Sequence, residues 1–313
     1  MNEKNQAQME AITHDQGPMM VLAGPGSGKT TVITERTKYL IEHYGVSPAR
    51  ILVITFTKAA ANEMKERFCQ LMGRSLPVSF GTFHAVFFTI LRHAYGYRYE
   101  HIISEEQKRQ IIQEVLAEEQ VDMAEEADFI SAMINEISLV KGEMIPLENY
   151  YSGQCSNEVF QDIFRGYERK LRANRKIDFD DMLVFTYELL KEREDILAVW
   201  QKKFQYILID EFQDINLVQY KIIQMLAKPE NNLFIVGDDD QSIYRFRGAK
   251  PDIMLGFPKD YKEAKKVLLD INYRCSEEIL TEAQKVIGQN EKRFSKKLTA
   301  FCGKQSPVHY IEC

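Results

Sequence analysis

The sequence predicts an α/β fold built on a parallel sheet, because two distant apolar runs each end in a polar tip. MMVLA leads into the glycine-rich segment AGPGSGKT at 23–30, and YILI leads into DEFQD at 210–214. Wholly apolar runs of this length are typical of strands that are buried on both faces of a parallel sheet. Both tips are then expected at the carboxyl edge of one sheet, where α/β proteins bind their ligands.

The segment AGPGSGKT fits the phosphate-binding loop pattern if alanine is allowed where the first glycine usually stands. Its glycines let backbone N–H groups face inward, and the helix predicted from about Thr30 to Glu42 presents its positive end to the same phosphates. Lys29 would bridge the β- and γ-phosphates, and the Thr30 hydroxyl would hold Mg²⁺. A glycine-rich turn that only caps a helix is the alternative. The residues assigned to the nucleotide here are Ala23, Gly24, Pro25, Gly26, Ser27, Gly28, Lys29, Thr30 and Thr31.

The segment DEFQD would supply the two groups that the loop lacks. Asp210 would hold the Mg²⁺, and Glu211 could accept a proton from an attacking water. A carboxylate pair after a strand could also cap a helix or lie in solvent. The phosphate loop has no other obvious source of a metal ligand and a base, so ATP and Mg²⁺ are the expected cofactors.

Further apolar runs predict strands over 51–56, 78–83, 233–238 and 266–270. Between 104 and 176 the pattern changes to helices, and Ser104 with Gln107 three residues later is a capping-box start. We therefore expect a nucleotide-binding unit over 1–103 and 177–275, interrupted by a mainly helical insertion over 104–176. Residues 276–313 are expected to begin a further unit.

Composition is typical of a large intracellular enzyme. The chain has 313 residues, of which 45% are hydrophobic and 27% charged. The net charge of −6 does not exclude nucleic acid as a partner, because residues 101–180 alone hold 17 acidic and nine basic side chains. The five cysteines lack metal-ligand or disulfide spacing, and no apolar stretch reaches the length of a membrane span. A cytoplasmic protein without a membrane partner is expected.

With these pieces in place, the chain resembles the UvrD/Rep/PcrA-type helicases of superfamily 1 from end to end. KNQAQMEAI (4–12) looks like the family's adenine-reading motif, with Gln8 as the reading amide. ITFTKAAANEM (54–64) and GTFHA (81–85) resemble its two motifs that touch single-stranded DNA. VGDDDQSIYRFRGA (236–249) and INYRC (271–275) resemble the motifs that couple the γ-phosphate to DNA. The resemblance implies a RecA-like P-loop NTPase domain with a helical inserted subdomain.

The same resemblance implies roles for individual residues. Gln241 would sense the γ-phosphate, Tyr273 would stack on adenine, and Arg274 would reach the γ-phosphate as an arginine finger. Core aromatics and an arginine paired with an acid are the alternatives. Phe246 replaces a common tryptophan, and Thr31 stands where an arginine beside the base is frequent, so adenine is expected to be held on one face. The DNA contacts implied are Phe56, Thr57, Thr82, His84, Tyr244, Phe246 and Arg247.

The expected function is the N-terminal motor half of an ATP-dependent DNA helicase that moves 3′ to 5′ on single-stranded DNA and unwinds duplex. Its partners would be single-stranded DNA, single-strand/duplex junctions and a second motor domain, of which residues 276–313 hold only the start. Weak ATP binding and little turnover are expected of this chain alone. An ATP-switched DNA-binding protein and a subunit of a helicase–nuclease remain open as alternatives.

A basic stripe lies inside the expected insertion. Arg165, Arg169, Arg172 and Lys176 stand at i, i+4, i+7 and i+11, which puts them on one face of a helix. Contact with nucleic acid is one interpretation of this stripe. A solvated face, or one paired with the acidic segment 114–128, is the favoured alternative.

Overall fold

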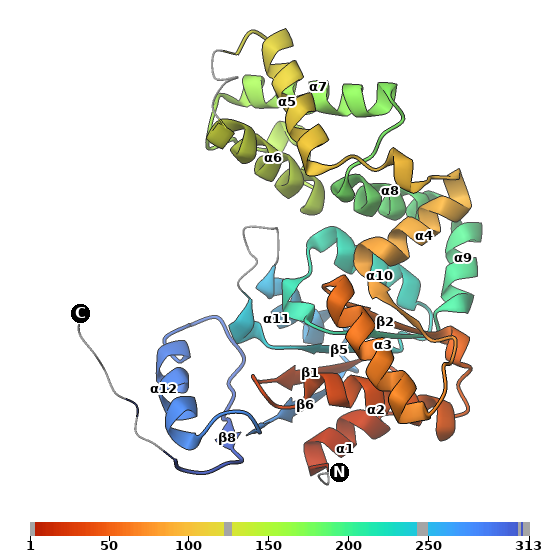
Figure 1. The fold of residues 1–313 in the computed structure, drawn as a ribbon, viewed down its shortest axis with the longest axis vertical. Helices are drawn as coiled ribbons and strands as arrows, with labels where there is room; N and C mark the ends of the chain where they lie inside the picture. Colours follow the sequence, from red (N-terminus) through yellow and green to blue (C-terminus); the bar gives the residue numbers. More distant parts are fainter. Residues whose placement is uncertain (1–3, 122–126, 243–249, 306–307, 309–313) are drawn as a thin grey trace.

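The structure is a computed structural model that describes residues 4–121, 127–242, 250–305 and 308. Its centre is a six-stranded sheet in the order β3-β2-β4-β5-β1-β6, and every neighbouring pair is parallel (Figure 1). The predicted parallel sheet is confirmed, and each predicted strand is found to within one residue at either end. The strands are β1 (Met19–Ala23), β2 (Ile51–Thr55), β3 (Ser79–Thr82), β4 (Tyr206–Ile209), β5 (Leu233–Gly237) and β6 (Lys265–Leu269).

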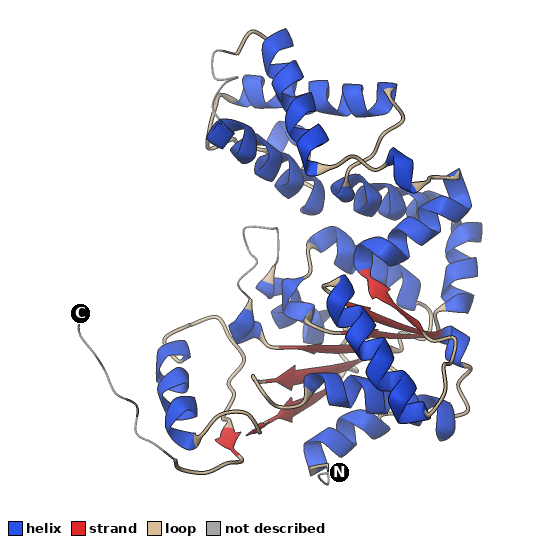
Figure 2. Ribbon diagram, viewed as in Figure 1, coloured by secondary structure: helices blue, strands red, loops and turns tan. Residues whose placement is uncertain are grey.

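Helices cover both faces of this sheet (Figure 2). One face packs against α1 (Gln6–Thr13), α2 (Lys29–Glu42) and α3 (Lys58–Met72). The other face packs against α4 (Phe83–Tyr95), α8 (Phe179–Glu192), α9 (Glu194–Lys203), α10 (Leu217–Ala227) and α11 (Pro251–Asp260). The described chain also contains α12 (Glu277–Ile287), a short parallel pair of β7 (Ile271–Asn272) and β8 (Thr299–Ala300), and the single turns η1 (Pro48–Arg50), η2 (Tyr99–His101), η3 (Leu147–Asn149), η4 (Phe212–Asp214) and η5 (Asp239–Gln241).

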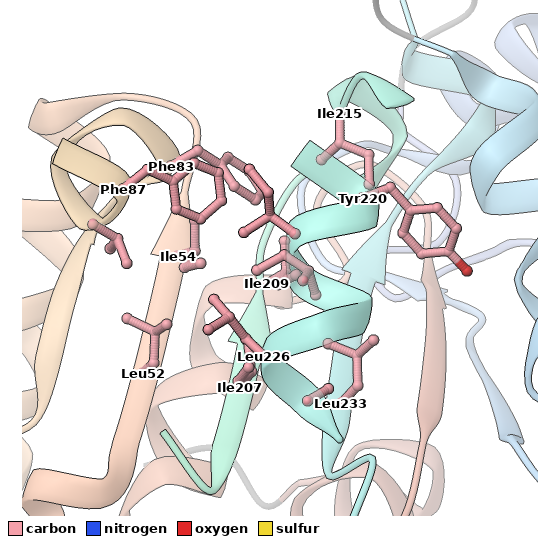
Figure 3. Packing of buried hydrophobic residues seen from close by; sticks show 14 of the residues in the cluster. Leu52, Ile54, Phe83, Phe87, Ile207, Ile209, Ile215, Tyr220, Leu226 and Leu233 are labelled. Carbon is pink, nitrogen blue, oxygen red and sulfur yellow. The ribbon is translucent and has the colours of Figure 1, made fainter. Parts of the chain in front are cut away.

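Alternating side chains of the inner strands β1, β2, β4 and β5 enter opposite cores, which explains why these four strands are mostly apolar and buried along their length, whereas the edge strands β3 and β6 are only partly buried. In β1, Met19 and Val21 belong to one core, whereas Met20 and Leu22 belong to the other. Figure 3 shows the second core, where side chains from β2, β4 and β5 meet those of α4 and α10. This two-sided burial fixes the register of the strands, and therefore the position of the loops at their carboxyl ends.

The helices α5 (Glu105–Glu118), α6 (Ala127–Gly142) and α7 (Asn157–Ala173) share a hydrophobic core of their own. The chain leaves for these helices and returns from them at adjacent points, because Ile103 N donates to Ile177 O at 3.0 Å and Ile177 N donates to His101 O at 2.9 Å. The predicted capping box at the start of α5 is confirmed by reciprocal bonds of 3.2 and 3.0 Å between Ser104 and Gln107.

A buried ionic network joins this helical group to the start of α8. Lys141 of α6 lies 3.1 Å from Asp178 and 2.6 Å from Asp181, and all three side chains are at most 6% exposed. Lys108 of α5 lies 3.2 Å from Asp180. Buried charges are tolerated only where their partners are in place, so this network fixes the angle between the helices and the sheet-bearing unit.

The basic stripe of α7 is largely engaged within the protein. Arg169 lies 3.8 Å from Glu119 of the acidic segment, and Arg165 lies 3.9 Å from Asp162. Lys176 Nζ donates to the backbone oxygen of Glu100 at 2.6 Å. These contacts favour the interpretation of a paired, solvated face. Across the described residues, the helices are too short or too polar to cross a bilayer.

Candidate functional site

The two predicted tips meet at the carboxyl edge of the sheet. Lys29 Nζ lies 3.2 Å from Glu211 Oε2, although 182 residues separate them in the chain. β1 and β4 are both parallel neighbours of β5, so the segments that follow them emerge at the same edge. The expectation that these distant motifs converge is confirmed by this contact.

The glycine-rich segment forms a compact turn before α2. Gly26 and Gly28 adopt left-handed backbone angles, with φ of 67° and 89°, which favour glycine. Ser27 closes the turn, since its Oγ donates to the backbone oxygen of Gly24 at 2.7 Å. α2 then begins at Lys29, so its positive end faces the space enclosed by the turn. This geometry is that of a phosphate-binding loop.

A cavity of about 510 Å³ lies over this loop and gathers most of the residues predicted for the nucleotide. It is lined by Pro25, Gly26, Ser27, Gly28, Lys29, Thr30, Thr31, Glu63, Arg67, Glu211, Gln241, Tyr273 and Arg274. Four predicted residues, Gln8, Ala23, Gly24 and Asp210, lie outside the lining. Gln8 contacts the loop from behind, because its Nε2 donates to the backbone oxygen of Ser27 at 3.1 Å.

Glu63 and Arg67 are the two lining residues that sequence reasoning missed. They stand one turn apart on α3 and form an ion pair of 2.5 Å. An acid and a base four residues apart on a helix are common on protein surfaces, so this spacing does not mark a site. The signal that the sequence does offer is their place on the helix that follows β2. Arg67 adds a cation to the cavity wall.

Glu211 is held toward the cavity by an unusual backbone conformation. Its φ of 51° is left-handed, a region that costs a non-glycine residue about 1–2 kcal/mol. Gln213 supports the side chain, since its Nε2 donates to Glu211 Oε2 at 2.9 Å. Both this bond and the contact with Lys29 fall on the same carboxylate oxygen. A strained, supported carboxylate at a cavity is a common arrangement at functional sites.

Asp210 lies behind Glu211 and is only 6% exposed. Burial, followed by the charge of Glu211, raises the pKa of Asp210 to about 7, while Lys29 opposes the shift. Burial and the charge of Glu211 also raise the pKa of Asp214 to about 6. Because ionisation of Asp210 is costly in the free protein, a bound cation nearby would stabilise its charged form. Thr30 and Asp210 offer the hard oxygen atoms that Mg²⁺ prefers, so the residues fit that ion.

The segment 271–275 is tied to the phosphate loop through Asn272. Its Nδ2 donates to the backbone oxygen of Pro25 at 2.7 Å, and its Oδ1 accepts from the backbone nitrogens of Arg274 and Cys275, each at 2.8 Å. Tyr273 N donates to the backbone oxygen of Gly26 at 3.0 Å. These bonds hold Tyr273 and Arg274 at the cavity.

A second cavity, of about 550 Å³, includes two of the residues predicted to contact DNA. Phe56 and His84 line it together with Phe179, a residue that is 46% exposed and whose ring centre lies 5.5 Å from that of His84. Burial lowers the pKa of His84, which favours the neutral ring. Phe179 was missed because its sequence context, an aromatic residue among helix-capping acids, is also typical of a buried helix start.

The remaining residues predicted to contact DNA fall into two groups. Thr57 and Thr82 cap α3 and α4, because their hydroxyl oxygens accept from Ala60 N at 3.1 Å and Ala85 N at 3.3 Å. Each hydroxyl keeps its own hydrogen for a further acceptor. Tyr244, Phe246 and Arg247 lie outside the described residues.

Gly26 provides a test of how closely the loop and segment 271–275 are packed. A Cβ at Gly26 would lie 2.6 Å from Arg274 Cβ, whereas Gly45, with a similar φ of 65°, has nothing within 4 Å. We expect Gly26→Ala to lower the free energy of unfolding by about 1–3 kcal/mol more than Gly45→Ala, because only the first substitution adds overpacking to backbone strain. Urea unfolding of both variants measures the difference. Equal losses would contradict the packing.

Asp210 makes stability depend on pH. Its raised pKa means that the folded state binds this proton more tightly than the unfolded chain, in which the pKa of aspartate is about 3.9. The associated stability is therefore complete below about pH 4 and is lost as pH rises through about 7. We expect Asp210→Asn to raise the free energy of unfolding at pH 8 by roughly 1–4 kcal/mol and by much less at pH 5. Urea unfolding at both pH values checks this; the idea fails if the gain is the same at each.

Comparison with known proteins places this chain in a family. Residues 4–262 match the family described as the UvrD/REP helicase N-terminal domain. The chain is 43% identical over 304 residues to YjcD of Bacillus subtilis (strain 168), covering 95% of this chain and 40% of that protein. It is 38% identical to the ATP-dependent DNA helicase PcrA of Staphylococcus aureus, covering all of this chain and 43% of the relative.

The PcrA of Leuconostoc citreum is 36% identical over 319 residues, which cover 99% of this chain and 42% of that protein. The chain thus spans about two fifths of the length of these relatives. The order of its motifs, the parallel sheet and the loop geometry agree with the family match. This chain belongs to the UvrD/REP helicase family and corresponds to its N-terminal domain.

Proposed function

We propose that this chain is the ATP-binding motor portion of a DNA helicase that uses ATP hydrolysis to move 3′ to 5′ along single-stranded DNA and to unwind duplex. The observation that carries the proposal is the convergence of Lys29 and Glu211 at one cavity, which Gln241 and Arg274 also line. The name of the relative PcrA describes it as an ATP-dependent DNA helicase. Single-stranded DNA and single-strand/duplex junctions are the proposed partners.

Binding of ATP would exchange one partner of Lys29 for another. In the structure its ammonium group pairs with Glu211, and a triphosphate on the loop offers a stronger partner of greater charge. Moving Lys29 toward the β- and γ-phosphates would free Glu211 to accept a proton from the attacking water. Gln213 would keep the carboxylate in place during this exchange.

Other residues would bind and sense the nucleotide. Thr30 and Asp210 would hold Mg²⁺, and the ion would supply positive charge to the phosphates. Gln241 would contact the γ-phosphate and Arg274 would reach it as an arginine finger, an interaction worth about 10³–10⁵ in rate in enzymes that use one. Tyr273 would stack on adenine, with Gln8 beside it as the reading amide. Tyr273 and Gln8 approach the same loop from opposite ends of the chain, which supports this assignment.

The proposed DNA groove adjoins the same sheet edge. Phe56 follows β2, which neighbours β4, and Thr82 ends β3, the next strand along, so both lie at the same carboxyl edge of the sheet. Bases would stack on or contact Phe56, His84 and Phe179. Stacking of this kind does not depend on the DNA sequence, because every base has an aromatic face. A conformational change at the proposed nucleotide cavity could be transmitted to these residues through the sheet, because β2 and β3 lie one and two places from β4.

We also propose the division of the chain into a motor unit over 1–103 and 177–275, an insertion over 104–176 and the start of another unit over 276–313. The separate core of α5 to α7 and the adjacent bonds at 101–103 and 177 support it. We propose a reducing, cytoplasmic location, since the four cysteines that the structure describes are free. We propose that by itself this chain turns over ATP slowly.

ATP hydrolysis with and without single-stranded DNA tests the proposed function. We expect DNA to stimulate hydrolysis and Lys29→Ala to lower it by about 100-fold or more, since a preorganised charge at the phosphates is lost. Lys38→Ala is the matched control, because Lys38 lies on the same helix and pairs with Glu42 at the surface. Hydrolysis that DNA does not stimulate would favour an ATP switch over a motor, and no hydrolysis or nucleotide binding would refute both.

Phe179 tests the proposed DNA groove. We expect Phe179→Ala to weaken binding of a fluorescein-labelled oligo-dT by about 1–3 kcal/mol, the usual loss for one stacked base. Tyr151→Ala is the control, since Tyr151 is 75% exposed and lines a different part of the surface. Fluorescence anisotropy gives both affinities; similar values for the two variants would argue against a groove at this place.

A further inference from the structure

Lys296 is a buried cation surrounded by three consecutive acids. Its Nζ lies 2.5 Å from Asp238, 2.6 Å from Asp239 and 2.8 Å from Asp240, and its side chain is only 1% exposed. Asp238 follows β5 and caps the turn η5, which contains Asp239 and Asp240 and ends at Gln241. Lys296 comes from the chain between α12 and β8, more than 50 residues further on. Sequence motifs single out the acids but give no sign of their partner.

The segment that holds Lys296 is anchored at several points. Arg293 binds Asp240 through two bonds of 2.8 and 2.6 Å, and Phe294 N donates to Asp239 Oδ2 at 2.8 Å. Leu298 packs against the phosphate loop, where a Cβ on Gly24 would lie 2.6 Å from Leu298 Cδ1. The segment 293–298 therefore contacts both the phosphate loop and the acids at η5.

Asp238 links this segment to Gln241. Its Oδ1 accepts from Lys296 Nζ, and its Oδ2 accepts from Gln241 Nε2 at 2.7 Å. The same residue is joined to the proposed base, because Asp238 N donates to Gln213 Oε1 at 3.0 Å and Gln213 Nε2 donates to Glu211 Oε2 at 2.9 Å. One polar network thus runs from Lys296 to Gln241 and to Glu211.

We propose that Lys296 is a positioning residue for Gln241 and acts through the carboxylate of Asp238. In this role it sets how well the site distinguishes a nucleotide with a γ-phosphate from one without. The inference rests on the proposed function, in which Gln241 contacts that phosphate. It assigns the function of a γ-phosphate sensor to a pair of segments rather than to η5 alone.

The charges explain why a cation is needed at this position. Asp238 and Asp239 are each 1% exposed at the side chain, so without Lys296 they would be buried close together with no neutralising charge at hand. One of them would then protonate or move, and either change alters the acceptor that holds Gln241. Burial disfavours the charged form of Lys296, but its hydrogen bonds to the three acids outweigh this and raise its pKa. The cation is therefore kept at neutral pH.

Nucleotide competition measures the proposed role without requiring turnover. The 313-residue chain is loaded with mant-ADP and Mg²⁺, and the probe is displaced by ADP or by the non-hydrolysable ATP analogue AMP-PNP. We expect Lys296→Met to reduce the preference for AMP-PNP over ADP by about tenfold, while ADP affinity stays within about twofold, since coupling within one hydrogen-bond network is commonly of this size. Lys296→Arg should restore most of the preference.

Two further comparisons separate positioning from a general loss of structure. Gln241→Ala should lose the same preference, and the double variant Gln241→Ala with Lys296→Met should lose no more than Gln241→Ala alone. Lys297→Met is the matched control, because Lys297 is the exposed neighbour in sequence. If Lys296→Met does not fold, Asp238→Asn replaces it: the amide exchanges one carboxylate oxygen for an NH2 group, so either Lys296 or Gln241 would face a donor where it now has an acceptor.

The results of these experiments distinguish failure of the positioning role of Lys296 from failure of the proposed function. Wild-type protein that binds neither nucleotide would overturn the proposed function and the inference with it. Nucleotide binding that Gln241→Ala impairs, but that Lys296→Met and Asp238→Asn leave unchanged, would overturn the inference alone. Losses that multiply in the double variant would also overturn it, because Lys296 would then act independently of Gln241.

Discussion

The pairing of Lys29 with Glu211 depends on one constraint, the parallel register of β1, β5 and β4. Because each strand is buried on both faces, a shift by one residue would move whole rows of side chains into the wrong core. The register is thus set by packing along the full length of the strands. Its consequence at the carboxyl edge is that a cation and a carboxylate from distant parts of the chain lie 3.2 Å apart.

Several locally unusual features lie at this edge of the sheet. Glu211 has a left-handed backbone, Asp210 is a buried carboxyl with a raised pKa, and Gly26 leaves no room for a side chain beside Arg274. The first two features lower stability in the free protein, and the third packs the segment 271–275 closely against the phosphate loop. Such a trade between stability and function is typical of binding sites, because a site must offer incomplete interactions that its ligand completes.

Two clusters of buried charge fix parts of the fold that hydrophobic packing alone leaves free to turn. Lys108 and Lys141 join the helical group to the start of α8, and therefore place Phe179 beside His84. Lys296 similarly joins the chain after α12 to η5. Because buried ion pairs require matched partners, they specify one arrangement more strongly than they stabilise it. Both surfaces proposed to bind ligands are positioned in this way.

The sequence by itself determined the strands, the phosphate loop, the α5 capping box and the order of the family motifs, because these depend on periodicity and on residues a few positions apart. Only the tertiary structure decided that Arg67 lines the cavity over the phosphate loop, that Phe179 lies beside His84, and that Lys296 pairs with three acids. No local pattern marks these residues. Their partners are brought together by helix packing and sheet register, which depend on the whole core at once.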